Sequence, residues 1–266
     1  MQPMQPMQPA YPWPYPRIVA HRGGGTLAPE NTLAALRCAL QYGFSAVEFD
    51  VMCAADGVPV LMHDAQLGRT VESACMRRGF ISDYPAHELQ QMDAGKWLAP
   101  QFAGEAVPLF SQAIDFCTAH QLWMNIEIKP ASGFDAATGH SVASTLQACL
   151  KTYGSTVSGH QPAPLFSSFS FAALEAARQA APDIARGLLV DRIPTDWQAQ
   201  LQLLNAVALH TNHEHLSPAS ARAIKQAGYG LFCYTVNDSA RAREILSWGV
   251  DGFCTDQLDV IGANFS

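Results

Sequence analysis

The stretch Ser45–Val51, with the sequence SAVEFDV, alternates acidic and apolar residues. Successive side chains of a β-strand point to opposite faces. Glu48 and Asp50 therefore share one face, and Val47 and Phe49 cover the other. Two carboxylates among apolar neighbours are costly unless a cation or a proton lies between them. The stretch predicts a buried strand that carries a chemical site on one face.

A second stretch, Met124–Lys129 with the sequence MNIEIK, repeats this pattern. Asn125, Glu127 and Lys129 share one face of the predicted strand. If both strands belong to one barrel, three carboxylates and a lysine meet at its C-terminal mouth, where barrel active sites lie. Carboxylate oxygens favour Mg²⁺ or Ca²⁺ over Zn²⁺. A solvated rim position or a salt bridge remains the alternative for each acid.

Around these stretches, short apolar runs alternate with helical patterns from Arg17 onward. Strands are expected at residues 17–21, 46–52, 122–128, 164–168, 184–190, 206–210, 230–236 and 250–254. Helices are expected at 31–42, 109–119, 141–152, 171–180, 217–227 and 238–247. Eight strands with intervening helices over about 240 residues predict an α/β fold, a TIM (β/α)8 barrel. An open doubly wound sheet is the alternative.

Two segments fall outside this alternation. Residues 64–106 show no clean strand–helix unit and predict a small subdomain inserted after the second strand; long excursions of this kind are usually functional. Residues 1–16 contain six prolines, which remove backbone donors and oppose helix, so a disordered Pro-rich tail is expected there. The barrel itself is expected to span residues 17–262.

The composition narrows the class of protein. The chain has 266 residues, of which 48% are hydrophobic and only 15% charged, and its net charge is −7. An acidic chain without a basic run is a poor candidate for nucleic-acid binding. No apolar run is long enough to predict a membrane span, and the start does not resemble a secretory signal. The seven cysteines are odd in number and form no CxxC, which favours free thiols and a cytoplasmic location.

Two histidines follow predicted apolar runs. His21-Arg22 precedes three glycines at the end of the first strand, and His63-Asp64 ends the run 58–62. An arginine offers a planar fork for phosphate, and a histidine titrates near neutral pH. Two histidines at strand ends suit a general acid and a general base in phosphodiester cleavage. A structural histidine is the alternative for each.

Other polar residues are expected to have structural roles. His210, His213 and His215 are interpreted as a polar loop at the barrel rim. Asp251 and Asp256 flank the last strand and are interpreted as turn and cap residues before a short final helix.

The motifs taken together resemble those of the glycerophosphodiester phosphodiesterase family, most closely its short bacterial members. The resemblance rests on His21-Arg22, Pro29-Glu30-Asn31-Thr32, Glu48-x-Asp50, His63-Asp64 and Glu127-x-Lys129. Segments 93–97, 104–108, 168–170, 234–237 and 249–256 also look like family segments in the family's order. Coverage is roughly residues 17–260, and an ordered series of this length is highly specific.

The resemblance implies roles for individual residues. His21 and His63 match the acid/base histidines, and Arg22 and Lys129 match the phosphate-binding cations. The carboxylates of Glu48, Asp50 and Glu127 match the ligands of one divalent cation, Mg²⁺ or Ca²⁺. Phe169 and Tyr234 are expected beside the substrate pocket; the family often has Trp at the position of Tyr234. The loop Pro29–Thr32 is expected to shape the mouth without reacting.

The implied activity is metal-dependent hydrolysis of a small-molecule glycerophosphodiester to sn-glycerol 3-phosphate and an alcohol. The nucleophile is either water or the substrate's own glycerol hydroxyl, which would give a cyclic phosphate. One alternative is a phosphodiesterase of the same barrel type that acts on lysophospholipids or inositol phosphodiesters. Another is a binder of phosphate esters that has lost catalysis. Such a binder is expected to lack one of the matched residues, and none is missing. The oligomeric state is left open.

Overall fold

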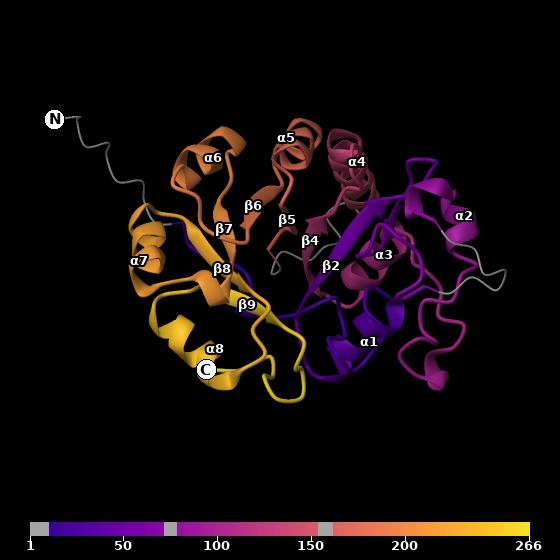
Figure 1. Cartoon of the computed structure of the whole chain (residues 1–266), viewed down its shortest axis with the longest axis horizontal. Coiled ribbons are helices and arrows are strands. Elements are labelled where there is room, and N and C mark those ends of the chain that lie inside the picture. The colour runs from indigo at the N-terminus through magenta and orange to yellow at the C-terminus, as the bar shows by residue number, and fades with distance from the viewer. Residues whose placement is uncertain (1–10, 72–78, 154–161) are drawn as a thin grey trace.

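Eight parallel strands close into a barrel in the computed structural model, which describes residues 11–71, 79–153 and 162–266 (Figure 1). Strand β1 pairs with both β2 and β9, and these pairings close the barrel. The predicted TIM barrel is confirmed. Its strands are β1 (Ile18–Ala20), β2 (Ala46–Cys53), β4 (Trp123–Ile128), β5 (Leu165–Ser168), β6 (Ala185–Val190), β7 (Ala208–Asn212), β8 (Gly230–Tyr234) and β9 (Gly252–Thr255).

Helices surround the barrel and bury one face each against the outer side of the strands (Figure 1). Side chains of Thr32, Ser170 and Ser217 cap three of them by accepting a backbone N–H. Helix α6, which precedes β7, was not among the helices named from the sequence; it begins without a side-chain cap and buries Leu201 and Leu204. The helices are α1 (Leu33–Gln41), α3 (Phe110–Ala119), α4 (Asp135–Tyr153), α5 (Phe171–Ala180), α6 (Trp197–Leu204), α7 (Pro218–Gln226) and α8 (Ser239–Ser247).

The predicted insertion after the second strand begins as a hairpin. Strand β3 (Pro59–Leu61) runs antiparallel to the end of β2, beyond the short β1, and so lies outside the barrel. The chain then forms η1 (Ile81–Asp83), α2 (Ala86–Leu89) and η2 (Pro100–Phe102) before α3. This region has its own apolar cluster, which includes Met52, Val60, Ile81, Leu89 and Val107. The hairpin brings the residues after β3 back to the barrel mouth.

An aromatic cluster fills the opposite, N-terminal end of the barrel. Trp13 stacks on Phe232 with ring centroids 5.9 Å apart, and Tyr15 stacks on Trp123 at 4.5 Å. Gly230 leaves room for this plug, because a Cβ there would lie 2.8 Å from the Trp13 ring. The structure therefore differs from the expected disordered tail over residues 11–16. The aromatic side chains of this segment pack into the open end of the barrel, which the strand pattern in the sequence does not reveal. Residues 1–10 lie outside the described residues.

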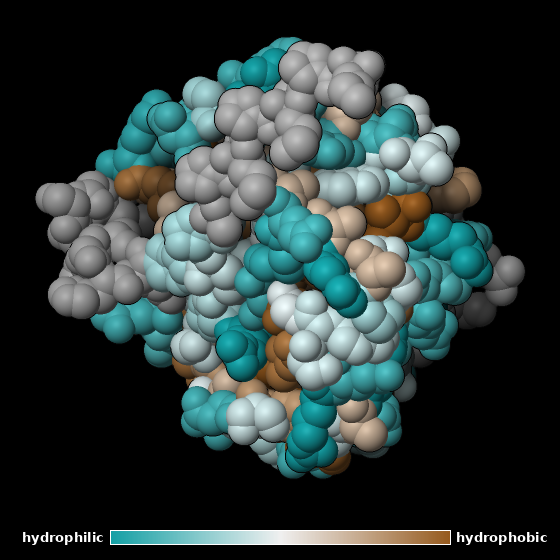
Figure 2. Space-filling model, turned by 90° about the vertical axis from the view of Figure 1, so that its left-hand side faces the viewer, coloured by the Kyte–Doolittle hydropathy of each residue, from teal (hydrophilic) through white to brown (hydrophobic). Residues whose placement is uncertain are grey.

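The flank in Figure 2, which lies on the left in Figure 1, is covered mainly by hydrophilic and intermediate residues. Apolar residues appear there only as small separate patches. Within the described parts of the chain, none of the helices has both the length and the apolar character required to cross a membrane.

Candidate active site

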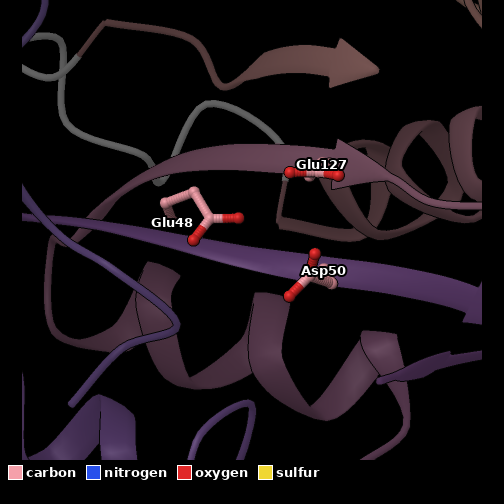
Figure 3. A group of neighbouring side chains, drawn as sticks. All are labelled: Glu48, Asp50 and Glu127. Atoms are coloured by element: carbon pink, nitrogen blue, oxygen red, sulfur yellow. The ribbon is translucent and has the colours of Figure 1, made fainter. Parts of the chain in front are cut away.

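Three acidic side chains from two neighbouring strands point into one space at the barrel mouth (Figure 3). Glu48 and Asp50 lie on β2 and Glu127 on β4, and one oxygen of each lies within 4.8 Å of the others. The register explains this proximity, because Asp50 pairs with Glu127 and Glu48 pairs with Asn125. The side-chain alternation expected from the sequence thus brings all three carboxylates together.

The three carboxylates are electrostatically unequal. Burial raises the pKa of Glu48 well above its ordinary value, and the charges of Asp50 and Glu127 raise it further. Burial likewise raises the pKa of Glu127 to about 7, with Asp50 contributing. Burial also raises the pKa of Asp50, but Lys129 and Arg22 outweigh it and hold that pKa below its ordinary value. Without a cation, the cluster therefore strongly disfavours charge on both glutamates.

The donor set fits a hard divalent cation. Within the described chain, Glu48 Oε1 is buried and accepts no hydrogen bond from the protein, although it belongs to a carboxylate cluster. An oxygen-only set of this kind matches the preference of Mg²⁺ and Ca²⁺. Glu48, Asp50 and Glu127 are thus the residues that can hold such an ion.

Two cations border the acids. Lys129 Nζ donates to Asp50 Oδ1 at 3.2 Å and lies 3.4 Å from Glu127 Oε1. Arg22 Nε lies 3.6 Å from Asp50 Oδ2, and its guanidinium also donates to Glu30 at 2.7 Å. Arg22 has a φ of +50°, an uncommon left-handed conformation for a non-glycine residue, while its backbone N–H donates to Glu48 Oε2 at 3.0 Å. The predicted phosphate-binding cations therefore lie beside the predicted metal ligands.

The loop Pro29–Thr32 orients Asp50. Asn31 Nδ2 donates to Asp50 Oδ2 at 2.8 Å, and the Asp50 backbone N–H donates back to Asn31 Oδ1 at 3.0 Å. Thr32 caps α1 and so fixes the end of the loop. The loop shapes the mouth, as the sequence analysis expected, and Asn31 does so by direct contact with a carboxylate.

His21 faces the carboxylates through one ring nitrogen and an aspartate through the other. Its Nε2 lies 3.8 Å from Glu48 Oε2, and its Nδ1 donates to Asp256 Oδ1 at 2.6 Å. Asn237 holds the other side of Asp256, donating to Oδ2 at 2.9 Å. The interpretation of Asp256 as a cap residue is wrong, because β9 ends beside β1 and aims this side chain at His21. A carboxylate directly after the last strand of a closed barrel is the sequence signal for this contact.

His63 is likewise held by an aspartate through one ring nitrogen. Its Nδ1 donates to Asp64 Oδ1 at 2.6 Å, and Arg69 ties Asp64 to Glu30. Burial lowers the pKa of His63; the charge of Asp50 opposes this effect, and Arg22 lowers the pKa further. Arg69 was not anticipated from the sequence, because it belongs to the insertion and contacts residues far along the chain.

Phe169 and Tyr234 meet after the ends of β5 and β8. Their rings form an edge-to-face pair with centroids 5.7 Å apart, and Phe169 is 51% exposed. The Tyr234 hydroxyl donates to the Val190 carbonyl at 3.0 Å, which fixes the ring. The pair offers an aromatic surface beside the carboxylates.

The three histidines that were expected at the rim, and Asp251, lie at different depths. His213 and His215 lie in the short helix η4 (His213–His215) after β7. The interpretation of His210 as a rim residue is wrong: β7 continues to Asn212, so strand alternation directs His210 into the barrel, where it is 1% exposed. Asp251 has a structural role, since it pairs with Lys225 and accepts the Leu231 N–H.

Comparisons with known proteins agree with the barrel fold. A glycerophosphodiester phosphodiesterase of Caldanaerobacter subterraneus subsp. tengcongensis is 29% identical over 245 residues, covering 92% of this chain and 95% of the relative. A phosphodiesterase of Oleispira antarctica, solved in complex with the product sn-glycerol-3-phosphate, is 35% identical with a TM-score of 0.84, covering 95% of this chain and 98% of that one. A glycerophosphodiester phosphodiesterase structure from Agrobacterium tumefaciens is 27% identical with a TM-score of 0.73, covering 91% and 96% of the two chains.

The family model for the glycerophosphoryl diester phosphodiesterase family matches residues 21–260. This range begins at His21 and includes every residue placed at the mouth above. The chain therefore belongs to the glycerophosphoryl diester phosphodiesterase family.

Proposed function

We propose that this protein hydrolyses glycerophosphodiesters to sn-glycerol 3-phosphate and an alcohol, using one divalent cation and two histidines. The observation that carries the proposal is the cluster of Glu48, Asp50 and Glu127 beside an imidazole whose far nitrogen is held by a carboxylate. The complex of the Oleispira antarctica relative with sn-glycerol-3-phosphate supports the product.

The cation, held by the three acids, would supply a Lewis acid for a phosphoryl oxygen. Arg22 and Lys129 stabilise negative charge on the phosphate, because both are already held beside the acids by ion pairs. This preorganisation avoids the cost of gathering charged side chains during the reaction.

The two histidines move protons. Asp256 and Asp64 each accept a hydrogen bond from Nδ1–H of their histidine, which leaves Nε2 of each imidazole available to the site. One imidazole takes the proton of the nucleophile, and the other protonates the leaving alcohol. The carboxylate partners fix the tautomer and favour the imidazolium form when it arises.

A product assay tests the proposal. The protein is incubated with a panel of glycerophosphodiesters that differ in their alcohol, with and without EDTA, and sn-glycerol 3-phosphate is measured. We expect release of this product, its loss on chelation, and its return with added Mg²⁺ or Ca²⁺. Full activity after exhaustive chelation would remove the cation from the mechanism, and no hydrolysis of any member would remove the activity.

A second candidate substrate class, the lysophospholipids, is favoured by one observation. Phe134 and Phe169 are exposed on the loops after β4 and β5, and Phe171 is exposed at the start of α5. A hydrogen bond from Ser170 to Asp135, the first residue of α4, joins the two segments. Exposed aromatic rings beside a mouth suit an acyl chain. Release of choline from lysophosphatidylcholine, faster than from the deacylated diester, would favour this class.

A further inference from the structure

Near the carboxylates, the described part of the barrel interior contains three polar side chains with atoms that have no protein partner. Asn125, Ser167 and His210 are 1–2% exposed. Among the described residues, Asn125 Oδ1, Ser167 Oγ and both His210 ring nitrogens are buried and make no hydrogen bond to protein. A buried polar group left without a partner costs about 1–3 kcal/mol, so three in one barrel call for an explanation.

The strand register places Asn125 and Ser167 beside the two glutamates. Asn125 pairs with Glu48, and Ser167 pairs with Glu127 on one side and with Gly187 on the other. A Cβ on Gly187 would lie 2.4 Å from His210 Nε2, so the imidazole lies over the Gly187 backbone, beside Ser167. All three side chains point inward. Leu165 shares a face of β5 with Ser167, Trp123 shares a face of β4 with Asn125, and Phe232 is the register partner of His210; these three apolar residues belong to the interior cluster.

The support of the three carboxylates is uneven. Asp50 receives hydrogen bonds from Asn31 and Lys129. Within the described residues, Glu48 accepts one backbone N–H, and Glu127 has the Lys129 ammonium beside it at 3.4 Å. Metal-binding carboxylates normally have further hydrogen-bond partners that fix their orientation. The two glutamates are thus the ligands that need further hydrogen-bond partners to fix their orientation.

We propose that Ser167, His210 and Asn125 line a chamber of ordered internal water that hydrogen-bonds to Glu48 and Glu127 and positions them for the cation. A polar pocket with several unsatisfied groups is the setting in which proteins hold buried water, which typically makes about three hydrogen bonds. Ser167 and His210 are positioning residues, since they act on the cation only through the glutamates. The inference deepens the proposed function and rests on it.

Two variants that each remove a buried hydroxyl distinguish positioning of the glutamates from a general effect of burial. Ser167→Ala removes an unpartnered hydroxyl beside Glu127, and Thr211→Val removes another buried, unpartnered hydroxyl. Thr211 follows His210 on β7 and therefore faces the opposite side of the strand. The readout is the Kd for Mn²⁺ alone, measured by titration calorimetry without substrate. We expect Ser167→Ala to raise this Kd about tenfold and Thr211→Val to leave it unchanged.

Variants of His210 supply the second test. His210→Gln keeps a donor and an acceptor, whereas His210→Leu removes both. We expect Mn²⁺ binding near wild type in the first and weakened about tenfold in the second, with circular dichroism showing that each is folded. If His210→Leu does not fold, the comparison of Ser167→Ala with Thr211→Val decides alone.

The outcomes distinguish this inference from the proposed function. Wild-type protein that binds Mn²⁺, together with a Ser167→Ala variant of equal affinity, overturns the chamber's role and leaves the phosphodiesterase proposal standing. Equal weakening in Ser167→Ala and Thr211→Val also overturns it, because a general loss of packing would then be the cause. Wild-type protein that binds no Mn²⁺ overturns the carboxylate site and the inference with it.

Discussion

At both ends of the barrel, alternate residues of each strand point inward, but these side chains are acidic at one end and aromatic at the other. At the C-terminal mouth, inward-facing positions carry Glu48, Asp50 and Glu127, and burial together with mutual repulsion raises the pKa values of the two glutamates. At the N-terminal floor, the interior carries Trp123 and Phe232, covered by Trp13 and Tyr15 from the N-terminal segment. Side chains of one strand therefore serve function at one end and stability at the other.

Strand β4 shows the difference within six residues. Trp123 packs in the floor, Asn125 lies in the middle, and Glu127 belongs to the mouth. Burying an aromatic ring favours folding, whereas burying like charges opposes it until a cation arrives. Substitutions at the mouth should therefore change turnover more than stability, and substitutions at the floor should do the reverse.

The largest effect is expected from His63→Ala. Loss of a group that transfers a proton should lower kcat by about 10²–10⁴-fold, while the melting temperature stays near that of wild type. Steady-state release of sn-glycerol 3-phosphate and a thermal melt measure the two quantities. His87→Ala, in the exposed part of α2, is the control and should change neither. A His63→Ala enzyme with wild-type turnover would remove the acid/base assignment.

At the floor, Trp13→Ala should act on stability alone. The ring fills the space over Gly230 and stacks on Phe232, so its removal leaves a cavity that costs about 3 kcal/mol. We expect a melting temperature lower by about 10 °C, with kcat at 25 °C unchanged. Trp13→Phe should recover part of the loss. A normal melting temperature in Trp13→Ala would show that residues 11–16 do not stabilise the barrel.

The sequence predicts the barrel and the carboxylate cluster because both depend on local periodicity. Alternation within SAVEFDV and MNIEIK fixes which side chains face inward, and strand pairing then brings Glu127 to Glu48 and Asp50. The floor is different, since a proline-rich segment has no periodicity that marks it as a plug. Its place depends on a cavity that exists only after eight strands have closed.

The role of Asp256 at the mouth also depends on a contact that forms only when the barrel closes. Asp256 is distant from His21 in sequence, and only the closure of β9 on β1 brings the two together. His210 was misplaced because the expected strand stopped at residue 210 and the real one continues to Asn212. Errors of a few residues at strand ends are harmless for the fold but decide whether a side chain is inside or on the rim.

The two aspartates that flank β9 provide the third test. Asp256→Asn keeps the shape but removes the carboxylate that accepts the hydrogen bond from His21 Nδ1 and orients the ring, so kcat should fall by about 10- to 100-fold. Asp251→Asn weakens the ion pair with Lys225 and should change stability slightly without altering kcat. The pH profile of kcat separates the two, since only Asp256→Asn should shift it. Equal effects of both variants on kcat would refute the positioning of His21 by Asp256.

The smallest expected effect concerns His210, which lies in the barrel interior between mouth and floor. We expect this residue to make the stability of the protein depend on pH. Burial lowers the pKa of His210 to about 3, whereas an unfolded histidine titrates near 6.5. Between these values the unfolded chain binds the proton and the folded chain does not, so the free energy of unfolding falls as pH falls below about 6.5. The loss should reach about 2 kcal/mol between pH 7 and pH 5.

Denaturant unfolding of wild type and His210→Gln at each pH measures this loss, because titrations common to both proteins cancel in the difference. The difference should be constant above pH 7 and should shift against wild type on acidification. A difference independent of pH down to pH 5 would show that His210 can take up a proton within the folded barrel.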